Sequence, residues 1–296
     1  LLKWLEHFKK DEECDHFYYE LDDRIYLIKI SYLFDGKHRV GYQFLITDDT
    51  DSRKYMKLLA NYNDRLSEEV AEKTEDIIQM HNRLLLGMAT MVESRDNSTG
   101  GHIRRTSDVV KILIDEIKKD TGNKKNMLML FGIDGLTEEF CKNVIQAAPM
   151  HDLGKIAVDD AVLRKPGKFT DEEYEKMKAH AAEGARIVDS ILEGTGNEAF
   201  HKVAVNVAHY HHERWDGSGY PEGLKGEEIP IEARIMAVAD VYDALVSKRV
   251  YKDKFSFEDA DNIMMDSFGR HFDKRLERYY VSAKPRLEEY YKSMGD

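Results

Sequence analysis

Cysteine is nearly absent from this sequence, because Cys14 and Cys141 are the only two among 296 residues. Two thiols are too few for a disulfide framework or a thiolate-rich metal site, and their scarcity suits the reducing cytoplasm. A basic surplus is lacking too, since the formal net charge is −12 and nucleic-acid-binding surfaces are basic. No apolar run is long enough to cross a bilayer. We therefore expect a cytoplasmic protein with no membrane segment in this chain and no nucleic-acid polymer as partner.

The first 50 residues are interpreted as a sensory segment. The chain begins with Leu1 rather than Met, so we expect a fragment whose further sensory or membrane-anchoring parts lie upstream. Residues 17–47 are rich in Tyr, Ile, Val and Phe and contain the turn "DGKH", which predicts antiparallel strands. The following "LITDDTDSRKYMKLL" is similar to the last strand and exit of a PAS sensor domain. Residues 1–50 are thus either a partial PAS-like segment or a small unrelated β segment.

Residues 51–92 are predicted to form one long helix, because no proline or turn cluster interrupts them before Gly87. Apolar residues recur along it at spacings of three and four. They are Leu59, Leu66, Val70, Ile77, Leu84, Met88 and Met91. This pattern is typical of a signalling helix or coiled-coil linker that pairs with its twin in a homodimer. The alternative is a helix that packs against its own domain.

Residues 93–296 consist of helical patterns joined by short loops, which predicts an all-α catalytic region. Four of these helices interrupt their apolar face with histidine or aspartate. The residues concerned are His151 and Asp152, His180, His211 and His212, and Asp240 with Asp243. Pro149 should end the helix just before His151. Thr170 and Glu173 predict a capping box at the start of the helix that carries His180.

Each of these polar residues alone has an ordinary structural explanation, such as a core histidine bonded to a carbonyl. Burying all of them without partners, however, would cost on the order of several kcal/mol, and a shared metal site would satisfy them together. Imidazole and carboxylate without thiolate favour Fe, Mn, Co or catalytic Zn. The number of ligands, with one carboxylate able to bridge, predicts at least two ions, an arrangement used for phosphoester hydrolysis. Lys155, four residues after His151, is placed to return toward the same site as a cation.

Several motifs in this region resemble those of the HD-GYP family, a branch of the HD-domain phosphohydrolases that degrades cyclic di-GMP. "HDLGK" at 151–155 looks like the HD motif of that family, and "HHERWDGSGYP" at 211–221 looks like its HHExxDGxGYP loop. The stretches "ESRDNSTGGHIRR", "LRKPGKFTDEEYEKMKAH", "ARIMAVADVYDALVSKRVYK" and "GRHFD" occur in the order of the family. The resemblance implies that residues 93–296 are a catalytic HD-GYP domain, folded as an all-α helical bundle.

The resemblance also implies a role for individual residues. His102, His151, Asp152 and Asp240 match the ligands of one metal ion, and His180, His211 and His212 match those of a second, with Asp152 bridging. The implied ions are divalent, Fe or Mn. Lys155 matches the lysine that assists the attacking hydroxide or the scissile phosphate, so Lys155 and Asp152 are the implied catalytic residues. Arg249 and Lys252 match residues that hold the substrate phosphates, and two such cations suit an anionic ligand in an acidic protein.

One departure from the family concerns the number of ions. Some members carry Glu four residues before the first ligand histidine, where it helps to bind a third ion, whereas this chain has Ser98. We therefore expect a two-metal site, and hydrolysis of linear pGpG to GMP is in doubt. Lys274 stands where the family usually has Pro, and we expect little consequence.

These observations predict a metal-dependent phosphodiesterase of bacterial second-messenger signalling. It would open cyclic di-GMP to pGpG by attack of a metal-bridging hydroxide on phosphorus. One alternative is a cyclic di-GMP receptor without turnover, although all seven ligands of a dinuclear site are present. Another is an HD phosphohydrolase of a different cyclic dinucleotide, such as cyclic GMP-AMP, because Arg249 and Lys252 do not discriminate between bases.

Overall fold

The computed structural model describes residues 16–96, 101–120, 136–248 and 254–294. The chain divides into two compact units, residues 1–78 and 79–296, and the division falls inside one long helix. None of the helices in the described ranges combines the length and the apolar character needed to span a membrane.

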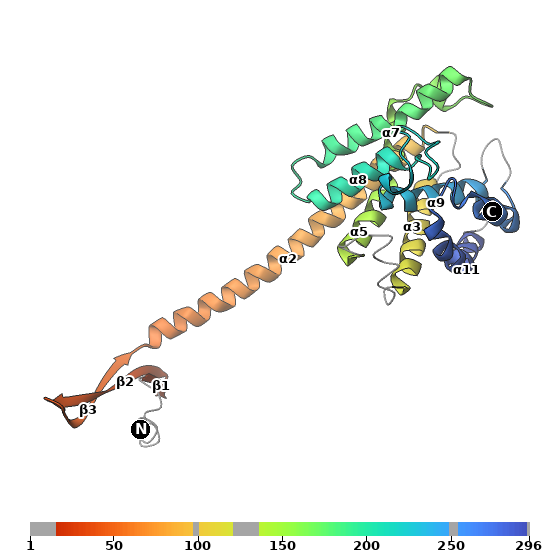
Figure 1. Cartoon of the computed structure of the whole chain (residues 1–296). Helices are drawn as coiled ribbons and strands as arrows, with labels where there is room; N and C mark the ends of the chain where they lie inside the picture. Colours follow the sequence, from red (N-terminus) through yellow and green to blue (C-terminus); the bar gives the residue numbers. More distant parts are fainter. Residues whose placement is uncertain (1–15, 97–100, 121–135, 249–253, 295–296) are drawn as a thin grey trace. The chain divides into compact units, whose positions relative to one another are not determined.

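The first unit contains a three-stranded antiparallel sheet of order β1-β2-β3 (Figure 1). The strands are β1 (His16–Leu21), β2 (Arg24–Asp35) and β3 (His38–Asp48). Phe17, Ile28 and Ile30 form a small buried cluster on one face of this sheet. The predicted antiparallel segment is confirmed, while its assignment as part of a PAS domain stays a prediction.

A single helix, α2 (Thr50–Glu93), follows the sheet for 44 residues. Its start is tied to β2, because Thr50 Oγ1 accepts a hydrogen bond of 2.8 Å from the backbone N–H of Ile25. The predicted apolar stripe, from Leu59 to Met91, is solvent-exposed along the described helix. A different set of side chains near the end of α2, Leu85, Ala89 and Val92, packs into the core of the second unit.

The second unit is the predicted all-α bundle. Its longer helices are α3 (His102–Lys119), α5 (Glu138–Ala147), α7 (Asp171–Leu192), α8 (Glu198–Tyr210), α9 (Ile231–Val246), α10 (Phe257–Ser267) and α11 (Glu277–Ser293), with the short α6 (Asp160–Leu163) and the 3-10 turns η1 (Ala148–Met150), η2 (Leu153–Ala157), η3 (Gly226–Glu228) and η4 (Lys274–Leu276). Small buried residues such as Ala147, Ala204 and Ala239 lie between the helices. They allow α8 to pack against α5, α7 and α9, and α3 to pack against α9 and α11 (Figure 1).

Two local signals in the sequence act as expected. Helix α5 ends at Ala147, and Pro149 lies in the 3-10 turn η1 that follows, because proline removes a helical donor and clashes with the preceding turn. Thr170 caps α7 through the predicted box with Glu173. His151 directly follows η1, and His180 lies within the helix that Thr170 caps.

Candidate metal centre

The loop with His151 and Asp152 lies between η1 and η2 and packs tightly against α7. Gly154 makes this approach possible, since a Cβ at that position would lie 1.9 Å from the carbonyl oxygen of His180. Only glycine can occupy such a position without moving the backbone. The backbone contact therefore fixes the distance between Asp152 and His180, which belong to different elements.

The structure brings all seven residues of the expected ligand set together in two groups. One ligand atom from each of His102, His151 and Asp240 lies within 4.8 Å of the others, and the same holds for Asp152, His180, His211 and His212. These residues come from α3, α7, α9 and the loops after η1 and α8. Asp240 Oδ1 lies 3.5 Å from Nε2 of His102.

The carboxylate of Asp152 lies between the two groups and offers one oxygen to each. Its Oδ2 lies 3.3 Å from Nε2 of His151 and 3.7 Å from Nε2 of His102. Its Oδ1 lies 3.5 Å from Nε2 of His180 and 3.9 Å from Nε2 of His211. This is the geometry that a bridging carboxylate requires.

Which ring nitrogen of His180 and His211 carries the proton shows whether a metal ion fits between them. Nδ1 of His180 lies 2.7 Å from the carbonyl oxygen of Met177, and Nδ1 of His211 lies 3.0 Å from those of Val207 and Ala208. A carbonyl only accepts, so each Nδ1 donates and each neutral ring leaves Nε2 as a bare lone pair. These two Nε2 atoms nevertheless lie 3.4 Å apart. Two lone pairs at that distance repel each other unless a cation lies near both, so the residues fit a metal ion.

The pKa values of the second group agree with neutral rings. Burial, together with the neighbouring His151 and His180, lowers the pKa of His211 to about 3. Burial likewise lowers the pKa of His180, and it lowers the pKa of His212 well below its ordinary value. At neutral pH these imidazoles therefore present lone pairs, the form in which histidine binds metals.

His102 behaves differently. Burial acts to lower its pKa, but hydrogen bonds to Asp152 and Asp243, together with the charge of Asp240, raise the pKa to about 10. Without a metal ion, the His102 ring is therefore a positively charged imidazolium with a proton on each nitrogen. Its Nε2 can donate to Nε2 of His151 at 3.2 Å. A metal ion bound to the first group has to displace that proton.

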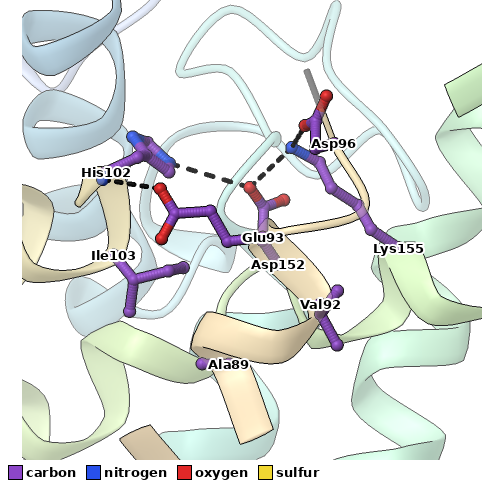
Figure 2. A pocket seen from close by; sticks show the side chains of 8 residues that line it. All are labelled: Ala89, Val92, Glu93, Asp96, His102, Ile103, Asp152 and Lys155. Carbon is purple, nitrogen blue, oxygen red and sulfur yellow. Dashed lines mark hydrogen bonds and ion pairs between the residues drawn. The ribbon is translucent and has the colours of Figure 1, made fainter. Parts of the chain in front are cut away.

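Lys155 is paired with two carboxylates. Its Nζ lies 2.8 Å from Oδ2 of Asp152 and 3.0 Å from Oδ2 of Asp96. Dashed lines in Figure 2 mark both ion pairs. Burial acts to lower the pKa of Lys155, but these two carboxylates raise it above its ordinary value. Lys155 in turn helps to hold the pKa of Asp152 well below its usual range, although burial opposes this. Both groups are therefore charged at neutral pH.

Three carboxylates hold this site in place, and of these only Asp243 was singled out in the sequence, without a specific role. Asp243 Oδ2 lies 2.7 Å from Nδ1 of His102, Glu93 Oε1 accepts the backbone N–H of His102 at 2.7 Å, and Asp96 pairs with Lys155. Glu93, Asp96, His102, Asp152 and Lys155 line one pocket (Figure 2). Asp243 stood out in the sequence as a second carboxylate on the face of Asp240, whereas Glu93 and Asp96 lie in the motif "ESRDNSTGGHIRR" without a role assigned to them.

The loop after His212 is ordered by backbone contacts. Glu213 Oε1 accepts hydrogen bonds from the backbone N–H groups of Glu222 and Gly223 at 2.7 and 3.0 Å. The Tyr220 ring covers the ring of His212, with centroids 4.7 Å apart. The loop is therefore held in place by Glu213, and its Tyr220 ring packs over His212, a member of the second ligand group.

Two further histidines lie outside the centre, and some residues singled out in the sequence are not described. His201 and His209 lie outside both ligand groups and pair with Asp189 and Glu222. Arg249 and Lys252, the predicted phosphate-binding residues, lie outside the described residues, as does Ser98. Lys274 forms an ion pair with Glu277 in the next turn.

Comparisons with known proteins agree with this site. A family model described as HD domain matches residues 72–276. A "Probable cyclic di-GMP phosphodiesterase" of Vibrio cholerae is 39% identical over 75% of this chain and 48% of its own length. A "Cyclic di-GMP phosphodiesterase" of the same organism is 40% identical over 69% of this chain and 39% of its length. Its "3'3'-cGAMP-specific phosphodiesterase 2" is 35% identical over 73% of this chain and 37% of its length.

The match thus spans less than half the length of each of these three relatives. The range matched by the family model, residues 72–276, includes both motif-bearing loops, at 151–155 and 211–221, and the residues of both ligand groups. The resemblance read from the motifs is confirmed at the level of the family, and this chain belongs to the HD domain family.

Proposed function

We propose that this protein is a metal-dependent phosphodiesterase that hydrolyses cyclic di-GMP to linear pGpG. The observation that carries the proposal is the position of Asp152, with one carboxylate oxygen beside each of two histidine groups. A pair of ions sharing one carboxylate is suited to phosphoester hydrolysis. Relatives that are 39% and 35% identical to this chain are named as phosphodiesterases of cyclic dinucleotides, which supports the substrate class.

Each residue of the centre has a proposed role. His102, His151 and Asp240 would hold one divalent ion and His180, His211 and His212 the other, with Asp152 shared between them. Fe or Mn suits this set of nitrogen and oxygen ligands. When bound, the ions would supply a hydroxide nucleophile at neutral pH and neutralise charge on the phosphate.

The charged Lys155 lies beside Asp152 and would stabilise negative charge that develops on the scissile phosphate. Arg249 and Lys252 would bind the phosphates of the substrate. Both offer cations to a dianionic ligand in a chain with a net charge of −12.

A second candidate substrate is cyclic GMP-AMP. One relative with 35% identity is named as specific for 3'3'-cGAMP. The metal ligands act on the phosphodiester and not on the bases, so they serve either substrate equally well.

The proposal is tested by product analysis of anaerobically purified protein, loaded with Fe(II) or Mn(II) and incubated with either cyclic dinucleotide. Accumulation of pGpG from cyclic di-GMP is the expected result, because Ser98 cannot supply the carboxylate of a third site. Rapid release of GMP would contradict the interpretation of Ser98. Turnover of cyclic GMP-AMP alone would transfer the proposal to that substrate, and metal binding without any turnover would favour a receptor.

We also propose a signalling arrangement for the whole chain. Residues 1–50 would sense, residues 51–92 would transmit, and residues 93–296 would catalyse. The exposed side chains of Leu59, Leu66, Val70 and Ile77 support a homodimer through α2, since they recur at helical spacing on a face that stays exposed. The scarcity of cysteine supports a cytoplasmic site of action. Sedimentation equilibrium should find a dimer that Leu66→Lys with Val70→Lys converts to a monomer.

A further inference from the structure

A tyrosine near the C-terminus is linked to a histidine of the metal centre through one carboxylate. Tyr291 lies in the last turn of α11 and donates its hydroxyl to Oδ1 of Asp243 at 2.6 Å. The other oxygen of that carboxylate, Oδ2, lies 2.7 Å from Nδ1 of His102. The Nε2 of the same imidazole faces Asp152 and Asp240. Two hydrogen bonds therefore connect α11 to a residue of the first ligand group.

Asp243 is a buried carboxylate on which three elements converge. Only 1% of its surface is exposed. Arg105 of α3 contacts both oxygens, with Nε 2.6 Å from Oδ1 and Nη2 3.2 Å from Oδ2, and Ser247 Oγ donates to Oδ1 at 2.9 Å. Arg105 compensates the buried charge, as a buried carboxylate requires. Tyr291 is the partner that α11 contributes.

The hydroxyl of Tyr291 acts on the orientation of the carboxylate. The last torsion of an Asp side chain is broad, so the direction of Oδ2 depends on what holds Oδ1. The ring of Tyr291 is itself held, because it packs edge-on against Tyr242 with centroids 5.7 Å apart. A fixed phenol thus joins Arg105 and Ser247 in holding Oδ1, while Oδ2 is aimed at His102.

We propose that Tyr291 is a positioning residue for the metal centre: its hydroxyl orients Asp243, which in turn presents Nε2 of His102 to the ion. The inference rests on the proposed function only in requiring that the group around His102 binds a metal. Removing a group that orients a metal ligand typically costs ~10–100-fold in metal affinity. Tyr291 acts through one more hydrogen bond, so we expect an effect near the lower end of this range, about 10-fold.

The neighbouring residue provides a matched control. Tyr290 lies on the same helix and donates its hydroxyl to Oδ2 of Asp108 on α3, also at 2.6 Å. Asp108 forms an ion pair with the exposed Arg104 one turn away and belongs to neither ligand group. Tyr291→Phe and Tyr290→Phe therefore each remove one hydroxyl and one bond between α11 and an aspartate. Only the first breaks the connection to His102.

The test is a titration of the full chain with Mn(II), in which the free ion is measured by electron paramagnetic resonance. The wild-type chain should bind two ions. Tyr291→Phe should weaken one of them about 10-fold and leave the other unchanged. Asp243→Asn should weaken the same ion at least as much, and Tyr290→Phe should bind both ions like the wild type. The two Tyr→Phe variants should melt at similar temperatures without metal, because both keep the aromatic ring.

Three results would overturn the inference. If the wild-type chain binds two ions and Tyr291→Phe binds both with unchanged affinity, the hydroxyl positions nothing, while the proposed function still stands. If the two Tyr→Phe variants weaken both ions equally, the effect belongs to the stability of α11 and not to His102. A wild-type chain that binds no Mn(II) or Fe(II) would refute the proposed function and this inference with it.

Discussion

The contact between Gly154 and α7 gives the sharpest prediction for the metal centre. In Gly154→Ala, the new Cβ would lie 1.9 Å from the carbonyl oxygen of His180 and 2.4 Å from the backbone nitrogen of Gly184. Both are backbone atoms of α7, so no side-chain rotation can relieve the collision. Because Cβ contacts below 3.0 Å are essentially never observed, η2 and α7 must separate by more than about 1 Å.

That displacement acts directly on the ligands. Asp152 lies on one side of the contact and His180 on the other, and metal–ligand distances tolerate only ~0.2 Å. We therefore expect Gly154→Ala to lose the ion held by His180, His211 and His212. A shift of 1 Å in a catalytic group costs ~100-fold in rate, and overpacking costs ~1–3 kcal/mol in the free energy of unfolding. Metal content by mass spectrometry, turnover of cyclic di-GMP and denaturant unfolding measure the three effects.

Gly87→Ala is the control for this substitution. Gly87 lies in α2, and apart from its chain neighbours and the adjacent backbone of that helix, no described atom lies within 4 Å of the position its Cβ would take. This variant should keep both ions and the wild-type rate, and it should gain up to ~1 kcal/mol of stability from the better helix propensity of alanine. A Gly154→Ala protein with two tightly bound ions and an unchanged rate would refute the claim that this contact sets the ligand geometry.

Three further predictions concern single residues. Asp152→Ala should bind neither ion, and an unchanged metal content in this variant would rule out the bridging role. Arg249→Ala should weaken cyclic di-GMP binding while sparing the metal content, whereas equal affinity would show that the phosphates bind elsewhere. Because the pKa of His102 is raised to about 10, the ring is an imidazolium at neutral pH, and the proton on its Nε2 must leave when an ion binds. Calorimetry in buffers of different ionisation enthalpy should register about one proton released per chain, with metal affinity rising as the pH approaches 10, and no release would contradict this.

Six of the seven expected ligands were accessible from the helical pattern because they interrupt otherwise apolar helical faces, whereas His102 was assigned only through the motif resemblance. His180 on α7 and Asp240 on α9 stand at positions where the helical period requires burial. A buried histidine or aspartate needs a partner, and several of them on separate helices point to a shared one. The HD and GYP motifs then identified the family. Glu93 and Asp96 interrupt no apolar helical face: Glu93 is the last residue of α2 and Asp96 follows it, and although both lie in the motif "ESRDNSTGGHIRR", their roles were not predicted.

The sequence by itself determined the helical character of residues 93–296, the ends marked by Pro149 and Thr170, and the imidazole and carboxylate groups available to a metal. These follow from local properties, namely periodicity, capping and the chemistry of single side chains. Only the tertiary structure decided which oxygen of Asp152 faces which histidine group, and that Lys155 lies between Asp152 and Asp96. It also decided that Tyr291 reaches Asp243 across 48 positions of the chain. Such relations depend on how distant helices pack, and packing is set by the volumes of all the buried side chains together and not by any one segment.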